Sequence, residues 1–287
     1  MITYCVVFLS VVAIIISIVS YQYFFTELDH HIPQGPTMTE FDPSVMRSKT
    51  AFVVGYTGEC GKELARLLVE KSVFAKVKLI GRRKVEYTDE KMKNVEQIVI
   101  DFDKLEDHKS AFDGCEVGFV CLGGTRKLGK ERQWVIDHDY PVNIGKIAKE
   151  SGCQHYHVIS SQGANANSYF LFYAKMKGQM ENDVKAVGLP RTSIYRPGFL
   201  MCERPERRLA EMLVGPPLRL YNKLNPTSLT IPTTTVAKAM IANCFTPPPP
   251  SSSSESSGPS FEILDNPTQH ALGETFDRSF HTAAENK

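Results

Sequence analysis

A turn built on three glycines constrains this chain most. Residues 50–54 are apolar, and Gly55, Gly58 and Gly61 follow them before a helix-forming run begins. A turn of this kind is tight, brings the backbone close to a pyrophosphate and lets the next helix pack on the sheet. The free N–H groups and the dipole at the helix start attract phosphate. The strand before the turn and the helix after it favour nucleotide binding over a purely structural turn. The turn residues expected to bind the cofactor are Gly55, Thr57, Gly58, Glu59, Cys60 and Gly61.

Short apolar runs alternate with helical stretches along the chain. Because strands that alternate with helices imply right-handed crossovers, the sequence predicts an α/β fold, with a doubly wound parallel sheet covered by helices on both faces. Strands are expected near 50–54, 76–80, 96–100, 117–122, 155–160, 191–195 and 261–264, and helices near 60–71, 104–112, 130–150, 169–187 and 233–244.

The domain organisation follows from shifts in composition. A hydrophobic segment, residues 1–26, precedes a polar linker rich in proline and glycine, residues 27–47. The nucleotide-binding domain is expected over residues 48–270. A run of prolines and serines at 246–260 reads as a disordered insertion, with a regulatory segment as the alternative. Residues 271–287 are expected to form a C-terminal tail.

The N-terminal segment has the length of a membrane-spanning helix. No charged side chain occurs from Ile2 to Thr26, and Val6 to Val19 is almost continuously apolar. About 20 such residues span the roughly 30 Å hydrocarbon core. A cleaved signal peptide is the competing interpretation, but no basic residue precedes the segment and no small-residue cleavage site follows it. We expect a transmembrane helix that anchors a cytosol-facing domain, with the cytoplasm or the nuclear envelope as the alternative location.

Charge and cysteine content limit which ligands and partners the chain is expected to bind. The 287 residues include 33 basic and 32 acidic side chains, so the net charge is +1 and no basic stripe suggests direct binding of nucleic acid. The seven cysteines are odd in number and lack Cys-x-x-Cys spacing. This pattern indicates reduced thiols rather than a disulfide framework, and no metal site is expected.

The end of the second strand indicates which dinucleotide binds. An acidic residue at this position would bind the 2′-hydroxyl of NAD. Here Gly81 is followed by Arg82 and Arg83, with no carboxylate. A guanidinium group pairs well with a 2′-phosphate, which favours NADP over NAD. The alternative is a solvated basic turn.

Residues after the third and fourth strands extend the predicted cofactor site. Asp101 and Phe102 follow the third strand, where they could contact the adenine, although a carboxylate at this place is often a helix cap. Leu122, Gly123 and Gly124 end the fourth strand at the edge of the sheet where the cofactor is expected.

The predicted chemistry lies beyond the fifth strand. Ser160 and Ser161 end that strand, and Tyr173 and Lys177 follow at a spacing that places them on one helix face. The ammonium group and a nearby positive nicotinamide would lower a tyrosine pKa that starts near about 10. Such a phenol can pass a proton to a carbonyl oxygen that either serine positions. Ser161, Tyr173 and Lys177 are therefore the candidate catalytic residues, with an ordinary amphipathic helix as the alternative.

These motifs, together with Pro197 and Gly198 in Tyr-Arg-Pro-Gly, resemble an atypical short-chain dehydrogenase/reductase. More narrowly, residues 49–245 resemble the oxidoreductase Tat-interacting-protein family, most clearly at 78–84, 113–119 and 196–204. The resemblance implies a Rossmann fold, bound NADPH, a redox-type site at Ser161, Tyr173 and Lys177, and Pro197 close to the nicotinamide. It also implies regulatory roles in nuclear import and transcription.

Three functions are compatible with the sequence. The first is an NADPH-dependent reductase of a carbonyl compound. The second is an NADPH-binding regulator of a protein partner in nuclear transport or transcription. The third is a structural module without cofactor, against which the intact glycines, arginines and tyrosine–lysine pair count. The sequence does not distinguish the first two functions, because residues 199–230, which would shape a substrate pocket, carry no motif that defines a substrate.

Overall fold

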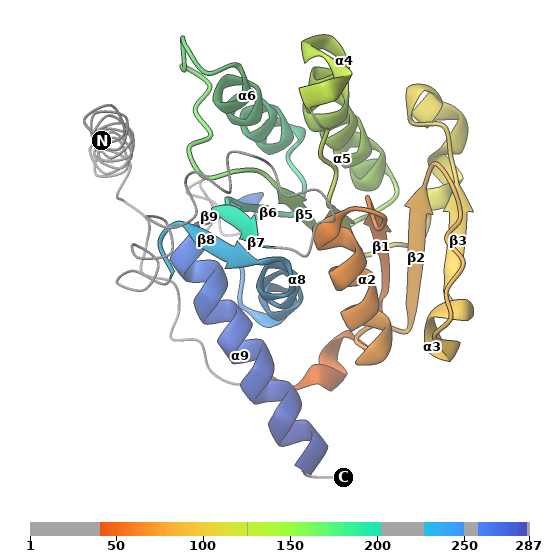
Figure 1. Ribbon diagram of the computed structural model, residues 1–287. Coiled ribbons are helices and arrows are strands. Elements are labelled where there is room, and N and C mark those ends of the chain that lie inside the picture. The colour runs from red at the N-terminus through yellow and green to blue at the C-terminus, as the bar shows by residue number, and fades with distance from the viewer. Residues whose placement is uncertain (1–40, 125, 202–226, 250–257, 286–287) are drawn as a thin grey trace, which may run out of the picture. The chain divides into compact units, whose positions relative to one another are not determined.

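The computed structural model describes residues 41–124, 126–201, 227–249 and 258–285 (Figure 1). The predicted transmembrane helix, the linker up to residue 40 and residues 250–257 of the Pro/Ser insertion lie outside these ranges. Within them, no helix is both long enough and apolar enough to cross a membrane.

A seven-stranded sheet organises the described residues, and all of its pairings are parallel. The order is β3-β2-β1-β4-β5-β6-β9, so the direction of strand addition reverses between β1 and β4. Ligands of doubly wound sheets bind at such a reversal, outside the carboxyl ends of the strands. The predicted Rossmann-type architecture is therefore confirmed. The strands are β1 (Thr50–Val54), β2 (Lys76–Gly81), β3 (Glu96–Val99), β4 (Val117–Val120), β5 (His155–Ile159), β6 (Arg191–Tyr195) and β9 (Ser260–Leu264).

Helices cover both faces of this sheet (Figure 1). Alternate residues of β1 point to opposite faces. Ala51 and Val53 belong to the core cluster that contains side chains of α2, α8 and α9, whereas Phe52 and Val54 belong to the cluster with η3, α5 and α6. The first set of helices is α2 (Glu59–Glu70), α8 (Thr233–Ala242) and α9 (Asn266–Glu285), and the second is η3 (Phe102–Phe112), α5 (Tyr140–Glu150) and α6 (Phe172–Val187).

The helix predicted over 130–150 is interrupted. It consists of α4 (Lys130–Trp134), a π-helical turn η5 (Val135–Asp139) and α5. Pro141 lies at the start of α5 and has no N–H group to donate to the carbonyl of Asp137 four residues earlier. The π turn therefore occurs where the regular hydrogen-bond ladder is broken.

Two further predictions need correction. The segment predicted as a helix over 104–112 is a 3₁₀ helix, η3, with non-helical backbone angles at Lys104 and His108. The predicted tail over 271–287 is helical through Glu285 as part of α9, because Leu272 and Phe276 are buried against the core. The elements that the sequence did not predict are η2 (Pro43–Met46), α3 (Glu90–Lys93), η4 (Arg126–Leu128), η6 (Asn243–Phe245) and the two-stranded sheet of β7 (Phe199–Met201) and β8 (Thr230–Pro232).

Candidate functional site

The glycine turn connects β1 to α2 at the reversal of strand order. Gly55 has a φ of +83°, and an added Cβ would lie 2.6 Å from the carbonyl oxygen of Cys121 at the end of β4. An added Cβ at Gly61 would overlap the carbonyl of Gly55. Both glycines are thus required for the close approach of turn, helix and neighbouring strand.

The remaining turn residues differ in their exposure. Thr57 and Gly58 are exposed at the start of α2, where the first N–H groups of a helix have no intrahelical partner. The carboxylate of Glu59 lies 2.7 Å from the ammonium of Lys62. Cys60 is buried in the core, so any contact of Cys60 with a cofactor would involve its backbone. The helix start therefore presents polar backbone groups suited to phosphate.

Hydrogen bonds from two side chains fix the backbone of the loop after β2. Arg82 and Arg83 are both exposed. The buried Tyr56 donates a hydrogen bond of 2.6 Å from its hydroxyl to the carbonyl of Arg83. The side-chain amide of Gln97 pairs with both backbone groups of Val85, at 2.8 and 2.9 Å. This loop therefore has a fixed backbone and presents two exposed arginine side chains.

Asp101 and Phe102 have structural partners. The carboxylate of Asp101 caps η3 by accepting a hydrogen bond of 3.0 Å from the N–H of Asp103. Phe102 is buried, with its ring centroid 5.3 Å from that of Tyr140. The helix-cap alternative for Asp101 is thus observed, and an adenine contact by either residue stays a prediction.

Asp137 organises the loop after β4 and was not found from the sequence. The N–H of Gly124 donates a hydrogen bond of 2.7 Å to Oδ2 of Asp137. An added Cβ at Gly124 would lie 2.9 Å from the same oxygen. Gly123, beside it, is exposed, and the half-buried Leu122 packs against the core. The only sequence signal for Asp137 was Pro141 within an otherwise helical run.

Lys177 is buried in an ion pair with Asp137. Its Nζ atom lies 3.0 Å from Oδ1 of Asp137, and the two side chains are 2% and 1% exposed. The same Nζ lies 5.9 Å from the centre of the Tyr173 ring. Burial alone would lower the pKa of Lys177, but the neighbouring Tyr173 and Asp137 outweigh it and the pKa is raised. Lys177 therefore carries a positive charge directly beside the candidate catalytic tyrosine.

Tyr173 and Ser161 are accessible, whereas Ser160 is not. Tyr173 lies in the first turn of α6 and is 38% exposed. The half-buried Ser161 donates a hydrogen bond of 3.2 Å to the carbonyl of Gln162. Ser160 is buried and donates to the carboxylate of Glu181 at 2.5 Å. Of the two serines, Ser161 is the one that a ligand can reach.

The Pro197–Gly198 segment lies beside the strand-five loop. The N–H of Gln162 donates to the carbonyl of Pro197 at 3.0 Å. The N–H of Gly198 donates to Oδ1 of Asn266 at 2.7 Å, and an added Cβ at Gly198 would overlap the carbonyl of Leu229. The site predicted after β5 is therefore in contact with the start of α9.

This fold and side-chain arrangement define a nicotinamide-dinucleotide-binding protein of the short-chain dehydrogenase/reductase type. The family described as NAD(P)H-binding matches residues 55–247. The protein HTATIP2 of Rattus norvegicus is 37% identical over 236 residues, which cover 81% of this chain and 92% of the relative. The chain therefore belongs to the NAD(P)H-binding family, as an atypical short-chain dehydrogenase/reductase of the Tat-interacting-protein type.

Other similar proteins agree on the fold. The mitochondrial protein FMP52 of Candida glabrata is 35% identical over 164 residues, 55% of this chain and 67% of the relative. MoeE5 in complex with UDP-glucuronic acid and NAD has a TM-score of 0.55, at 13% identity over 76% of each chain. A UDP-glucuronic acid 4-epimerase from Bacillus cereus in complex with NAD has a TM-score of 0.52, at 12% identity over 75% of this chain and 77% of that one.

The expected location requires correction. The sequence predicted a membrane-anchored protein with a cytosol-facing domain. The described ranges contain no helix that could cross a membrane, and the fungal relatives are named mitochondrial, so these findings do not bear out the expected location; residues 1–26, on which it rested, lie outside the described ranges.

Proposed function

We propose that this chain is an NADPH-dependent oxidoreductase that reduces a carbonyl group of a small molecule. The observation that carries the proposal is the placement of Lys177. Its ammonium is fixed by Asp137 next to the exposed Tyr173, beyond the carboxyl end of β5. A charge at this place stabilises the phenolate that forms when the tyrosine gives up its proton.

The residues present fit a dinucleotide. Gly58 is exposed at the start of α2, and the turn lies where the strand order reverses. Two arginines and no carboxylate follow β2, which supports NADP as the preferred form. The other residues expected to line the cofactor at its nicotinamide end are Leu122, Gly123 and Gly124 after β4, Tyr173 and Lys177 on α6, and Pro197 after β6.

Each candidate catalytic residue has a distinct role in this proposal. When bound, the nicotinamide supplies the hydride. Tyr173 donates its phenolic proton to the carbonyl oxygen as negative charge develops there. Ser161 donates a hydrogen bond that orients the same oxygen. Lys177 lowers the cost of the phenolate, and Asp137 fixes the position of Lys177.

A substrate screen tests this function directly. Purified protein is mixed with NADPH and a panel of aldehydes and ketones, and oxidation is followed by the loss of NADPH absorbance. The proposal expects turnover with at least one compound, and loss of that turnover in Tyr173→Phe. Tight NADPH binding without turnover of any compound would contradict it.

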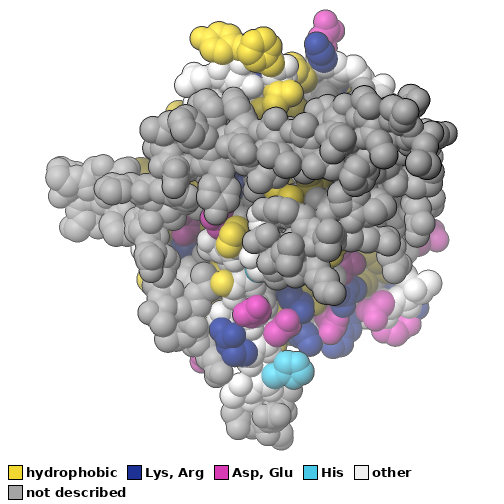
Figure 2. All heavy atoms as spheres, turned by 60° about the vertical axis from the view of Figure 1, so that its left-hand side comes forward, with side chains coloured by type: hydrophobic (Ala, Val, Ile, Leu, Met, Phe, Trp, Pro, Cys, Tyr) yellow, Lys and Arg dark blue, Asp and Glu magenta, His cyan; other side chains and the backbone are white. Residues whose placement is uncertain are grey.

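One observation favours a second candidate, an NADPH-binding regulator of a protein partner in nuclear transport or transcription. Tyr169, Phe170 and Leu171 are 94%, 97% and 62% exposed just before Tyr173. Apolar side chains project from the surface at the top of Figure 2. Exposed apolar groups of this size are common where a partner binds. A regulator would lose its partner on Gly58→Asp, which blocks the cofactor, and keep it on Tyr173→Phe.

A further inference from the structure

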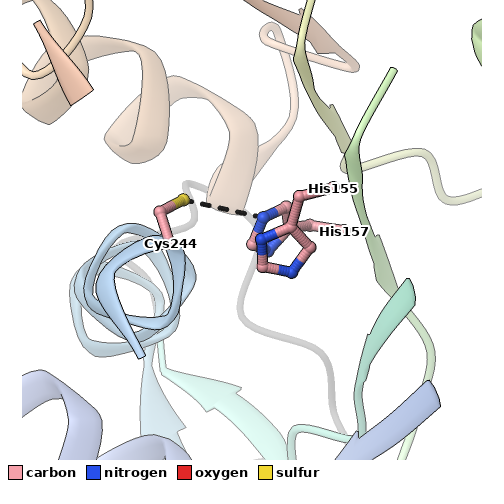
Figure 3. A group of neighbouring side chains, drawn as sticks. All are labelled: His155, His157 and Cys244. Carbon is pink, nitrogen blue, oxygen red and sulfur yellow. Dashed lines mark hydrogen bonds between the residues drawn. The ribbon is translucent and has the colours of Figure 1, made fainter. Parts of the chain in front are cut away.

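Three potential metal ligands meet on the side of the sheet that contacts α8. His155 and His157 are two residues apart on β5, so their side chains leave the same face of the strand. Cys244 comes from η6, directly after α8. All three are buried, and their ligand atoms lie within 4.8 Å of one another. Figure 3 shows the two imidazoles side by side and facing the thiol.

The spacing between sulfur and nitrogen matches a tetrahedral ion. The Sγ atom of Cys244 lies 3.6 Å from Nε2 of His157. Zinc bonds are about 2.3 Å to cysteine sulfur and about 2.0–2.1 Å to histidine nitrogen. With a tetrahedral angle, those bond lengths separate the two ligand atoms by about 3.6 Å. An ion could therefore bind between these residues with little movement of the backbone.

Hydrogen bonds leave a coordinating nitrogen on His155. Its Nε2 atom lies 2.7 Å from Oγ of Ser193. That hydroxyl donates its single proton to Glu262, at 2.5 Å. Nε2 of His155 must therefore be the donor, which leaves the lone pair on Nδ1. A metal ion would therefore bind this ring through Nδ1.

Both ring nitrogens of His157 also have hydrogen-bond partners. Nδ1 lies 2.9 Å from the hydroxyl of the buried Tyr195, and Nε2 lies 3.6 Å from Sγ of Cys244, whose thiol donates to the carbonyl of Met240 at 3.5 Å. Nε2 therefore carries the ring proton without a metal, and binding an ion through Nε2 would move that proton to Nδ1, which would then donate to the Tyr195 hydroxyl. Ligand histidines in metalloproteins almost always hold their second nitrogen in such a hydrogen bond. Each imidazole therefore has one ring nitrogen held by a hydroxyl group, Ser193 for His155 and Tyr195 for His157, as is usual for histidines that bind a metal.

A cavity gives access to this cluster. It has a volume of about 430 Å³ and is lined by His155 and Cys244, together with Lys49, Arg191 and Thr246. Its residues flank the amino ends of β5 and β6, opposite the edge that carries Tyr173 and the glycine turn. The guanidinium of Arg191 is paired with Glu262 at 2.8 Å, which reduces its repulsion of a cation.

We propose that His155, His157 and Cys244 bind one divalent transition-metal ion, with zinc the best match, and that a fourth coordination position is open to this cavity. Two imidazoles and one thiolate form a ligand set that zinc accepts. Cys244 loses its thiol proton to solvent when the bond to the metal forms. The ion would connect β5 to the segment that follows α8, apart from the dinucleotide site.

Cobalt is a suitable probe because its bond to a thiolate absorbs in the near ultraviolet. Full-length protein is stripped with EDTA and titrated with Co²⁺ and then with Zn²⁺. The expected result is one equivalent of Co²⁺ per chain, the thiolate absorption, and displacement of Co²⁺ by Zn²⁺. Absence of saturable Co²⁺ binding with this absorption in the unmodified protein would overturn the proposal, whatever the variants do.

Variants then assign the ligands. Cys244→Ser should remove the absorption, whereas Cys115→Ser, a buried cysteine outside the cluster, should retain it. Tyr195→Phe keeps the ring but removes the contact to His157, and should weaken Co²⁺ binding about 10–100-fold. Thermal melting in EDTA checks that each variant folds. An unchanged absorption in folded Cys244→Ser would place the metal at another cysteine and refute the site.

Discussion

The ammonium of Lys177 lies 3.0 Å from the carboxylate of Asp137, and neither side chain is more than 2% exposed. Asp137 also accepts a hydrogen bond from the N–H of Gly124, in the loop after β4. One carboxylate thus links the lysine beside Tyr173 to the loop on which a nicotinamide would rest. The ion pair therefore connects α6 to the loop after β4, in addition to placing a positive charge beside Tyr173.

Replacing Asp137 should be costly for stability. Asp137→Asn would leave the Lys177 charge buried without its counter-ion, and breaking a buried pair in this way costs about 3–5 kcal/mol. Urea denaturation measures the change. Asp139→Asn is the matched control, because Asp139 is in the same π turn but 40% exposed. Equal shifts of the two midpoints would contradict the structural role of Asp137.

The hydroxyl of Tyr173 should matter for turnover alone. Tyr173→Phe keeps the ring, so NADPH affinity should stay close to that of the unmodified protein. Loss of the general acid should reduce kcat about 10²–10⁴-fold, as measured with a compound found in the carbonyl screen. Tyr169→Phe, in the exposed segment before α6, should leave kcat unchanged. Undiminished turnover in Tyr173→Phe would rule out this residue as the acid.

The two arginines after β2 should set the cofactor preference. We expect NADPH to bind at least about tenfold more tightly than NADH, which corresponds to about 1.4 kcal/mol. Calorimetry with Arg82→Ala and Arg83→Ala should show most of this preference lost. Lys84→Ala removes an exposed positive charge one residue further on and should retain it. Equal affinities of the unmodified protein for both cofactors would refute the assignment.

The glycine turn should tolerate no side chain at Gly55. Gly55→Ala would place a Cβ 2.6 Å from the carbonyl of Cys121 in a backbone with a φ of +83°, so both folding and cofactor binding should suffer. Gly114→Ala is the control, since Gly114 has a φ of +68° but open space around it. In Gly114→Ala the free energy of unfolding should fall only by the conformational cost of about 1–2 kcal/mol, and cofactor affinity should be unchanged. Thermal melting and NADPH titration distinguish the two effects.

Stability should fall in strongly alkaline solution partly because of Tyr140. Burial, and then the hydrogen bond to Asp103, raise the pKa of Tyr140 to about 12, whereas an unfolded tyrosine ionises near about 10. The folded state therefore retains a proton that the unfolded state loses, and the free energy of unfolding falls as pH rises from about 10 to about 12. Below that range the contribution is fully present. Urea denaturation at several pH values between about 10 and about 12 measures this dependence. The free energy of unfolding should fall less steeply with pH in Tyr140→Phe than in Tyr169→Phe.

Patterns of local origin were predicted correctly from the sequence. The strands β1, β2 and β6 lie where their apolar runs placed them, and the glycines lie at the reversal of strand order. These features depend on residues close together in the chain, such as Gly55 and Gly61, whose backbones meet. Periodicity and turn chemistry report such relationships directly.

Relationships between distant residues were missed. Asp137 reads as one more polar residue in a helical run, because its partners Lys177 and Gly124 come from other elements. The sequence predicted no metal site on the basis of cysteine spacing, and that prediction is untested. The proposed ligands Cys244 and His157 are 87 residues apart and meet only after the sheet has formed. Spacing rules detect ligands within one local unit and do not see those that tertiary packing brings together.

The contact between Gly198 and Asn266 has a consequence for how the protein is made. The segment after β6 is fixed by the first residue of α9, which follows both the Pro/Ser run and β9 in the chain. During synthesis on the ribosome, the glycine turn emerges roughly two hundred residues before that anchor, at about 5–20 residues per second. The glycine turn therefore leaves the ribosome many seconds before Asn266 is available to fix Gly198, so this part of the site is completed last.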